Sequence, residues 1–88
     1  MNVDISRAFV KDTEPLPKKS KLVILELIIE IQLAKVPNDI WDCSKLKGAD
    51  DIYRIRRGVY RVTFQYDGTT ATIKRVLPRG QIYKKHNL

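Results

Sequence analysis

The sequence predicts an α+β domain in which two N-terminal helices pack on a twisted, mainly antiparallel sheet of about four strands. Three observations predict it: a leucine-rich segment without glycine in the first half, alternation of polar and apolar residues in the second half, and a hairpin signal at Asp67-Gly68. The 88 residues suffice for one hydrophobic core but not for two. We therefore expect residues 1–88 to form a single domain.

The first half predicts a short strand and then helices. Residues 3–5 are expected to form a strand that runs into a brief helical turn ending near Glu14. The segment from Lys18 to Lys35 predicts a helix of about 18 residues. Pro17 suits its beginning because a missing N–H has no cost there, and Pro37 closes it. The helix is apolar over most of its circumference, so we expect it to be covered on more than one side.

Residues 36–51 are rich in Pro, Asn, Asp and Gly and predict a loop, with Ile40 and Trp41 as its apolar anchor. A lone tryptophan in a small protein more often packs than stacks on a base, and both roles stay open. Cys43 is the only cysteine, which rules out an internal disulfide and fits a reducing compartment. No activating base is adjacent, so we expect a structural residue rather than a nucleophile.

The second half predicts a meander of strands. The expected strands are Tyr53 to Arg57, Tyr60 to Tyr66 and Thr69 to Leu77, and residues 81–83 could add a short further strand. A tight turn at Arg57-Gly58 joins the first two, and Asp67-Gly68 is typical of a type I′ hairpin. Alternation places Arg54 and Arg56 on one face, and it points Ala71 and Ile73 inward.

Positive charge gathers in this second part. The chain has a net charge of +7; residues 53–88 contain nine Lys/Arg and one acid, Asp67, whereas residues 1–52 contain eight Lys/Arg and nine Asp/Glu. Guanidinium groups stay charged and match phosphate oxygens in geometry. A basic composition alone also fits a solvated surface. Several arginines crowded on neighbouring strands, however, favour a polyanionic partner.

The sequence shows no sign of secretion or membrane insertion. The N-terminus lacks the basic start and the long apolar run of a signal peptide. The longest apolar stretch, residues 22–34, is interrupted by Glu26, Glu30 and Gln32 and is shorter than the roughly 20 residues that cross a bilayer. We expect a cytoplasmic protein without a membrane partner.

Several short segments together resemble the RelE/ParE toxins of toxin–antitoxin systems. They are Pro17-Lys18-Lys19 at the start of the long helix, Lys45-Leu46-Lys47-Gly48, Tyr53-Arg54-Ile55-Arg56, Gly58-Val59-Tyr60-Arg61-Val62, and Arg75-Val76 followed by Arg79 and Tyr83. The resemblance runs from about Phe9 to Tyr83. It implies the α+β fold described above and a neighbouring antitoxin that wraps the toxin and masks its basic surface.

The resemblance implies one of two activities. RelE-like members enter the ribosomal A site and cut mRNA by attack of the ribose 2′-hydroxyl on the adjacent phosphate, without metal or cofactor. ParE-like members instead inhibit DNA gyrase and lack the cutting residues. The RelE-like activity is favoured, because this chain has a cation at each position that matches a basic residue of the RelE cutting surface. It also has an aromatic residue, Tyr83, at the position that matches the aromatic residue of that surface. A non-catalytic or inactivated RNA-binding relative is a third hypothesis.

The RelE-like hypothesis implies candidate residues for catalysis and for RNA binding. The implied catalytic set is Arg56, Arg61, Arg79 and Tyr83, and the implied RNA-binding set is Lys45, Lys47, Arg54, Arg57, Lys74, Lys84 and Lys85. A fixed guanidinium at Arg61 would stabilise the charge that builds up on phosphate oxygens during transfer. Arg79 would contact the leaving 5′-oxygen, and Tyr83 would stack on a base or orient the phosphate.

Two departures from the family pattern affect the acid/base roles. Arg54 and Arg56 stand where RelE itself has lysines, and arginine cannot lose its proton to act as a base. The general base is therefore unassigned, with His86 as a candidate because of its ordinary pKa. Pro78-Arg79-Gly80 stands where relatives often show a histidine followed by two arginines.

Overall fold

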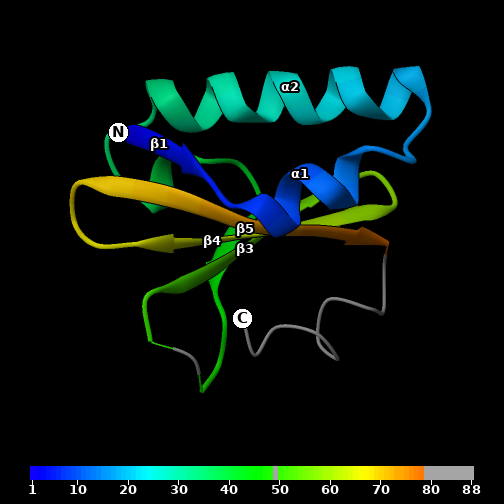
Figure 1. Ribbon diagram of the computed structural model, residues 1–88. Helices are drawn as coiled ribbons and strands as arrows, with labels where there is room; N and C mark the ends of the chain where they lie inside the picture. Colours follow the sequence, from blue (N-terminus) through cyan, green and yellow to red (C-terminus); the bar gives the residue numbers. More distant parts are fainter. Residues whose placement is uncertain (49, 79–88) are drawn as a thin grey trace.

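The structure, a computed structural model, describes residues 1–48 and 50–78. The elements in chain order are β1 (Asn2–Ile5), α1 (Arg7–Thr13), α2 (Lys18–Leu33), the 3₁₀ helix η1 (Pro37–Asp39), β2 (Cys43–Lys45), β3 (Ile52–Arg57), β4 (Tyr60–Tyr66) and β5 (Thr70–Pro78). Helix α2 lies across one face of the sheet, and α1 lies near β5 (Figure 1). This arrangement confirms the predicted α+β class with two N-terminal helices.

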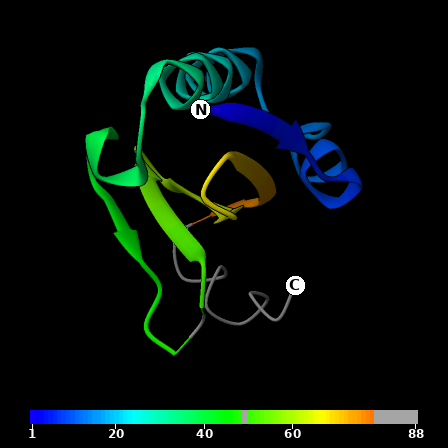
Figure 2. The same ribbon diagram turned by 90° about the vertical axis from the view of Figure 1, so that its left-hand side faces the viewer.

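The sheet has five strands in the order β1-β5-β4-β3-β2 and twists strongly (Figure 2). Strand β1 pairs with β5 in parallel, and the other pairs are antiparallel. The sequence predicted about four strands, and β2 is the strand that it did not predict. It spans three residues inside the segment expected to be a loop, which is too short for alternation to be recognised. Residues 81–83 lie outside the described residues.

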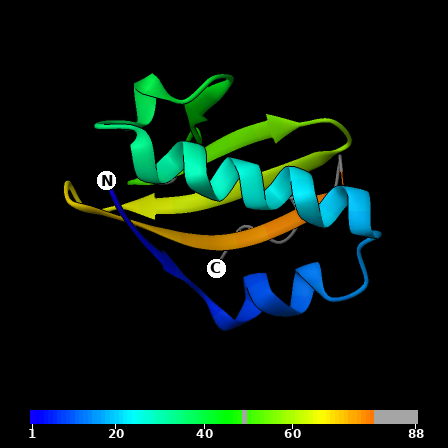
Figure 3. The same cartoon turned by 90° about the horizontal axis from the view of Figure 1, so that it is seen from above.

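Helix α2 ends at Leu33, two residues before the expected end. The Ala34 N–H donates to the carbonyls of Glu30 and Ile31, at 3.1 and 3.2 Å. The Met1 ammonium donates to the carbonyls of Gln32, at 3.0 Å, and Ala34, which places a positive charge at the negative end of the helix dipole. Seen from above, the start of β1 lies beside this end of α2 (Figure 3). No helix within the described ranges is long and apolar enough to cross a membrane.

The hydrophobic core lies between α2 and the sheet. From α2, the residues Ile24, Leu27 and Ile31 are buried. The sheet contributes Ile55, Val62, Phe64, Ala71 and Ile73, and α1 contributes Phe9. The burial of Ala71 and Ile73 confirms the predicted alternation in this part of β5. Because the outward residues of α2 are exposed, the expectation that the helix is covered on more than one side is wrong for this chain by itself.

The hairpin at Asp67-Gly68 is confirmed, but its turn is not type I′. A type I′ turn requires a positive φ at both central residues. Gly68 has a φ of 97°, but Asp67 is not among the residues with positive φ. Instead, the Asp67 carboxylate accepts the N–H groups of Thr69 and Thr70 at 2.8 and 2.7 Å. These two bonds close a loop that is one residue longer than the type I′ turn.

A β-bulge in β5 shifts the alternation of its last residues. Thr63 pairs with Arg75 and Phe64 pairs with Ile73, so Lys74 has no partner on β4. An extra residue in one strand moves every later side chain to the other face. Without the bulge, alternation from Ala71 and Ile73 would point Arg75 into the core. With the bulge, Val76 points into the core instead.

The bulge is next to an ion pair that joins the sheet to α1. Arg75 donates to both Asp12 carboxylate oxygens, at 2.7 and 2.9 Å, and the Val76 N–H donates to the same carboxylate at 3.1 Å. Both side chains are largely buried, with 19% and 11% of their areas exposed. The Asp12 hydrogen bonds raise the pKa of Arg75, so it remains charged. Asp12 thereby also gives the backbone N–H of Val76 an acceptor.

Replacing Asp12 with asparagine should lower the free energy of unfolding by about 1.5–3 kcal/mol, the range for hydrogen bonds to charged groups. The variant leaves the Arg75 guanidinium partly buried without a carboxylate. Urea denaturation followed by circular dichroism measures the change. Glu14→Gln, at the exposed end of the same helix, is the control and should be neutral. Equal stability of the two variants would contradict a structural role for the Asp12–Arg75 pair.

Candidate functional site

The face of the sheet turned away from α2 brings three arginines together. In the β3–β4 pairing, Arg56 is directly opposite Arg61, and Arg54 is opposite Thr63. The intervening pair of Ile55 and Val62 belongs to the core, so the arginines alternate to the other side. Arg54, Arg56 and Arg61 are referred to as the arginine face. The prediction that Arg54 and Arg56 share one face is confirmed.

Two polar residues, Asp42 just before β2 and Ser44 within it, hold two of the arginines of the arginine face. The Asp42 carboxylate accepts the Arg56 Nε at 3.1 and 3.0 Å and its terminal nitrogen at 2.7 Å. Arg54 donates to the Ser44 hydroxyl. Asp42 has a left-handed backbone with a φ of 57°, and its carbonyl accepts the Arg56 N–H at 3.3 Å. These contacts orient two like-charged side chains that would otherwise repel each other.

Sequence reasoning missed Asp42 and Ser44. A signal was present: the two residues are spaced by two, and so are Arg54 and Arg56, as antiparallel neighbours require. In the structure, Ser44 pairs with Arg54 and Cys43 pairs with Ile55, so the two segments are indeed antiparallel neighbours.

The Arg56 hydrogen bonds, with help from the positive charge of Arg54 and Arg57, hold the pKa of Asp42 below its ordinary value of 3.8. A lowered pKa in the folded state means that the pair adds stability above the ordinary pKa and loses it as the pH falls through the lowered value. An NMR titration should therefore show the Asp42 carboxylate more than half ionised at pH 3.8. An Arg56→Gln variant should titrate closer to the ordinary value. An unchanged midpoint in that variant would contradict the assigned cause.

Arg57 points to the other face of the sheet, the face that α2 covers, and its side chain links the sheet to α2. Its guanidinium donates to both Glu30 carboxylate oxygens at 2.8 and 2.9 Å and to the Trp41 carbonyl at 2.7 Å. The guanidinium also lies over the Trp41 ring, 5.1 Å from the centroid. Only 14% of the Arg57 side chain is exposed. Glu30 of α2 is thus part of an ion pair with β3.

The predicted apolar anchor of the loop is half confirmed. Ile40 is buried in the core, whereas Trp41 is 72% exposed. The indole ring packs against the Arg57 guanidinium and not into the core. Trp41 is therefore a surface residue, and the expectation that it anchors the loop is wrong.

The other candidate residues lie around the arginine face or beyond it. Lys45 and Lys47 are exposed on β2 and in the loop that follows, and Lys74 lies at the bulge of β5. Arg61 is half-buried, and its guanidinium donates to the Tyr60 carbonyl at 3.2 Å. Arg79, Tyr83, Lys84, Lys85 and His86 lie outside the described residues. The structure thus brings Arg54, Arg56 and Arg61 together but separates Arg57 from them.

Burial raises the pKa of the Cys43 thiol to about 11. The thiolate is the reactive form, so a pKa two units above the ordinary 9.0 lowers its fraction about 100-fold near neutral pH. Cys43 should react with a disulfide reagent about 100 times more slowly in the native chain than in urea at the same pH. Similar rates in both conditions would contradict its assignment as a structural residue.

Comparison with known proteins identifies relatives of similar length. No family model matches the chain. Toxin RelE3 of Methanocaldococcus jannaschii is 38% identical over 84 residues, covering 94% of this chain and 96% of the relative. RelE1 of the same organism is 32% identical over 85 residues, covering 94% of both chains.

Solved structures agree with these relatives. The toxin-like match in the RelB–RelE complex from Methanococcus jannaschii has a TM-score of 0.79 and 34% identity, covering 92% of this chain and 95% of that chain. The RelE–RelB complex from Pyrococcus horikoshii matches with a TM-score of 0.73 and 32% identity, covering 91% and 96%. The intact RelBE complex of E. coli, at 19% identity and a TM-score of 0.68, shares the fold. With two relatives above 30% identity over nearly their whole length, the chain belongs to the RelE family of toxins.

Proposed function

We propose that this chain is the toxin of a toxin–antitoxin pair and that it cuts mRNA in the ribosomal A site. The observation that supports the proposal best is the arginine face, where Arg56 and Arg61 stand opposite each other on adjacent strands. Two guanidinium groups at one place offer several donors to the oxygens of a single phosphate. Like charges directly opposite each other on paired strands repel. The Asp42 carboxylate offsets this repulsion at Arg56, and a phosphate bound between the two guanidinium groups would offset it further.

The reaction is a transfer of the phosphoryl group within the RNA. The 2′-oxygen forms a bond to the adjacent phosphorus while the bond to the 5′-oxygen of the next nucleotide breaks. A general base takes the proton of the 2′-hydroxyl, and an acid returns a proton to the leaving 5′-oxygen. The products are a 2′,3′-cyclic phosphate and a 5′-hydroxyl. Arg61 stabilises the added charge on the phosphate oxygens in the transition state.

Asp42 and Ser44 support this role by holding the neighbouring arginines. The bidentate bond from Arg56 to Asp42 fixes the plane of the guanidinium, yet half of the Arg56 side chain stays exposed. An incoming phosphate thus meets a side chain that is already oriented and loses little conformational entropy on binding.

The remaining roles are proposed from the sequence. Arg79 contacts the leaving oxygen, and Tyr83 stacks on a base, with His86 as a candidate acid or base. Lys45, Lys47, Arg54, Lys74, Lys84 and Lys85 bind the RNA backbone. Arg57 reaches a phosphate only if its ion pair with Glu30 opens. No metal or cofactor enters the proposed reaction.

The antitoxin is the second proposed partner. Solved relatives are complexes of RelE with RelB. An acidic segment of such a partner would bind the arginine face by charge complementarity and exclude the phosphate. We propose that the antitoxin inhibits this chain in the cytoplasm by that competition.

Induction of the chain in a bacterial host, with 5′ ends of mRNA mapped within minutes, tests the function. We expect new 5′-hydroxyl ends inside translated frames, absent with Arg61→Ala and retained with Arg7→Ala, which removes an exposed arginine from α1. Growth arrest with intact messages would contradict mRNA cleavage and point to gyrase, to be examined by DNA-damage induction. Normal growth with intact messages would overturn the proposal in favour of a non-catalytic relative.

A further inference from the structure

Trp41 is a large aromatic side chain that the fold leaves in solvent. Its exposed fraction is 72%, although the residue before it, Ile40, is buried in the core. Aromatic side chains dominate the energetics of cores and interfaces, so an exposed tryptophan forgoes a large gain within the chain. Exposure alone assigns no role, because single exposed apolar residues are common on protein surfaces. The contacts around the ring decide its role.

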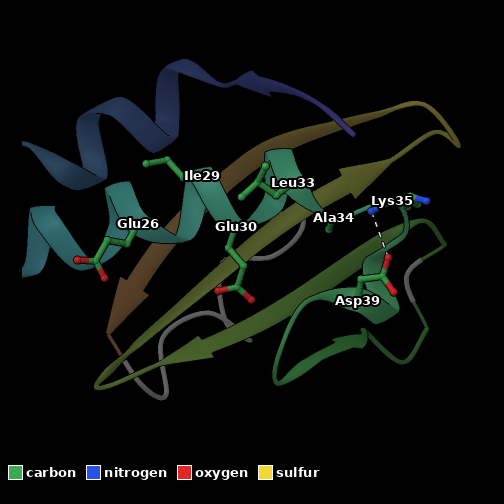
Figure 4. Close-up of a pocket in the computed structure, with 7 residues that line it drawn as sticks. All are labelled: Glu26, Ile29, Glu30, Leu33, Ala34, Lys35 and Asp39. Atoms are coloured by element: carbon green, nitrogen blue, oxygen red, sulfur yellow. Dashed lines mark hydrogen bonds between the residues drawn. The ribbon is translucent and has the colours of Figure 1, made fainter.

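One ion pair holds the backbone of Trp41 on both sides. Its N–H donates to the Glu30 carboxylate at 3.1 Å, and its carbonyl accepts the Arg57 guanidinium at 2.7 Å. Glu30 and Arg57 are themselves paired at 2.8 Å. Glu30 and Asp39 line the same groove of about 500 Å³ (Figure 4), and Asp39 accepts the N–H of Lys35 at 3.1 Å, which holds η1 against the end of α2. The loop therefore presents the indole ring from a backbone that several contacts hold in place.

The ring is oriented by a fixed cation. The Arg57 guanidinium lies over the indole at 5.1 Å from its centroid, an attractive cation–π contact. Only 14% of the Arg57 side chain is exposed, because it is bound to Glu30 and to the Trp41 carbonyl. The guanidinium covers one face of the indole, and the high exposure of Trp41 leaves the other face in solvent. A flat aromatic face that is already oriented is the kind of platform on which the bases of single-stranded nucleic acids stack.

Trp41 lies at the edge of the sheet beside the arginine face. The pairing of β2 with β3 continues one residue beyond β2, where the Asp42 carbonyl accepts the Arg56 N–H at 3.3 Å. The Asp42 side chain binds the Arg56 guanidinium as well. Trp41 is the next residue along this segment, so its Cα is about 3.8 Å from that of Asp42. A base attached close to a phosphate at Arg56 would therefore lie near the indole ring.

We propose that Trp41 stacks on a nucleobase of the RNA whose phosphate binds at the arginine face. The proposal rests on the proposed function for RNA as the partner. A strand of RNA combines flat bases with a negative backbone, and this combination matches an exposed indole that lies one residue from the Asp42–Arg56 pair. Every base has an aromatic face, so the stack requires a base at this position and does not read its identity.

The fluorescence of Trp41 tests the stack directly, because it is the only tryptophan in the chain. The probe is a short single-stranded RNA with methylated 2′-hydroxyl groups, which lacks the attacking hydroxyl and cannot be cut. We expect this RNA to quench the fluorescence of the purified chain as it binds. An abasic strand with the same number of phosphates should bind without this quenching. Equal quenching by the abasic strand would overturn the proposal, because the ring would then respond to charge alone.

Variants measure the contribution of the ring to affinity. Trp41→Ala should bind the methylated RNA about 5- to 150-fold more weakly, the range for the loss of one base stack, and Trp41→Phe should lose less because it keeps an aromatic face. Leu33→Ala removes an apolar residue that is 80% exposed on α2 and is the matched control, which should bind normally. Anisotropy of a labelled strand gives the affinities, and a thermal melt of each variant confirms folding. An affinity of Trp41→Ala within twofold of that of Leu33→Ala would overturn the proposal.

The dependence of binding on salt separates stacking from charge. Trp41→Ala should weaken binding by the same factor at low and at high salt, because a base stack releases no counterions. Arg54→Gln, which removes a contact proposed to bind phosphate, should instead reduce the slope of log affinity against log salt by about 1. A reduced slope for Trp41→Ala would mean that the substitution acts by displacing an arginine such as Arg57. That result would overturn the assignment of a stack.

Binding and cleavage are measured apart, because the methylated RNA cannot be cut. Binding that depends on bases and on Trp41, by a chain that leaves cellular mRNA intact, would refute the nuclease and support the stack. Cleavage of mRNA by a chain whose Trp41→Ala variant binds RNA normally would do the reverse. Unchanged RNA binding of Trp41→Ala with weaker binding to the protein encoded by the adjacent reading frame would identify a protein as the partner of the ring and overturn the proposal.

Discussion

Arg61→Ala is expected to slow the proposed mRNA cleavage by about 100- to 1000-fold, the usual cost of removing one fixed donor to a transition-state charge. Arg61 is half-buried near the start of β4, opposite Arg56, so its guanidinium lies at the proposed phosphate site. Single-turnover cleavage on programmed ribosomes, with enzyme in excess, measures the chemical step apart from binding.

The fold of Arg61→Ala should survive, because the substitution also removes the repulsion between two arginines on paired strands. Arg61→Lys keeps the charge but not the planar fork, and should give an intermediate rate. Arg7→Ala, at an exposed residue, controls for the loss of one positive charge. A rate for Arg61→Ala within threefold of Arg7→Ala would refute the assigned role, since both lose one charge.

Phe64→Ala is expected to lower the free energy of unfolding by about 3–5 kcal/mol. Phe64 has no exposed surface, and its ring stacks on Tyr53 with centroids 5.3 Å apart. It lies on β4, which has neighbouring strands on both sides. A loss of this size is a large part of the 5–15 kcal/mol that stabilise a typical domain, so much of the variant should be unfolded at 37 °C.

Urea denaturation followed by fluorescence and by circular dichroism gives the stability of each variant. Phe64→Leu keeps most of the volume and should cost less than about 1.5 kcal/mol. Val59→Ala, at a turn residue that is 65% exposed, should change the stability by less than about 0.5 kcal/mol. If Phe64→Ala were as stable as Val59→Ala, Phe64 would not be the centre of the core.

Most of the fold is predictable because its signals are local. The long apolar segment of α2, the prolines around it and the alternation in β3 and β4 are properties of neighbouring residues. They predicted two helices, the strands of the meander and the shared face of Arg54 and Arg56. Strand β2 and the bulge at Lys74 were missed, because each depends on the register of a partner strand.

The contacts of the candidate site were less predictable. Arg57 and Arg56 are adjacent and chemically identical, yet one binds Glu30 on α2 and the other binds Asp42 beside β2. The pair Asp12–Arg75 joins residues from opposite ends of the chain. Such partners depend on which distant segments pack together, and no local pattern encodes that.

The sequence by itself determined the fold class, the concentration of positive charge after residue 52 and the common face of Arg54 and Arg56. The periodicity of a strand or helix involves only neighbouring residues, and charge is counted from composition, so both can be recognised without a structure. The tertiary structure decided which arginines form structural ion pairs, which remain around the candidate phosphate site, and which apolar side of α2 is left uncovered. These outcomes follow from long-range packing, which places Glu30 beside Arg57 and leaves Leu25, Ile29 and Leu33 of α2 exposed.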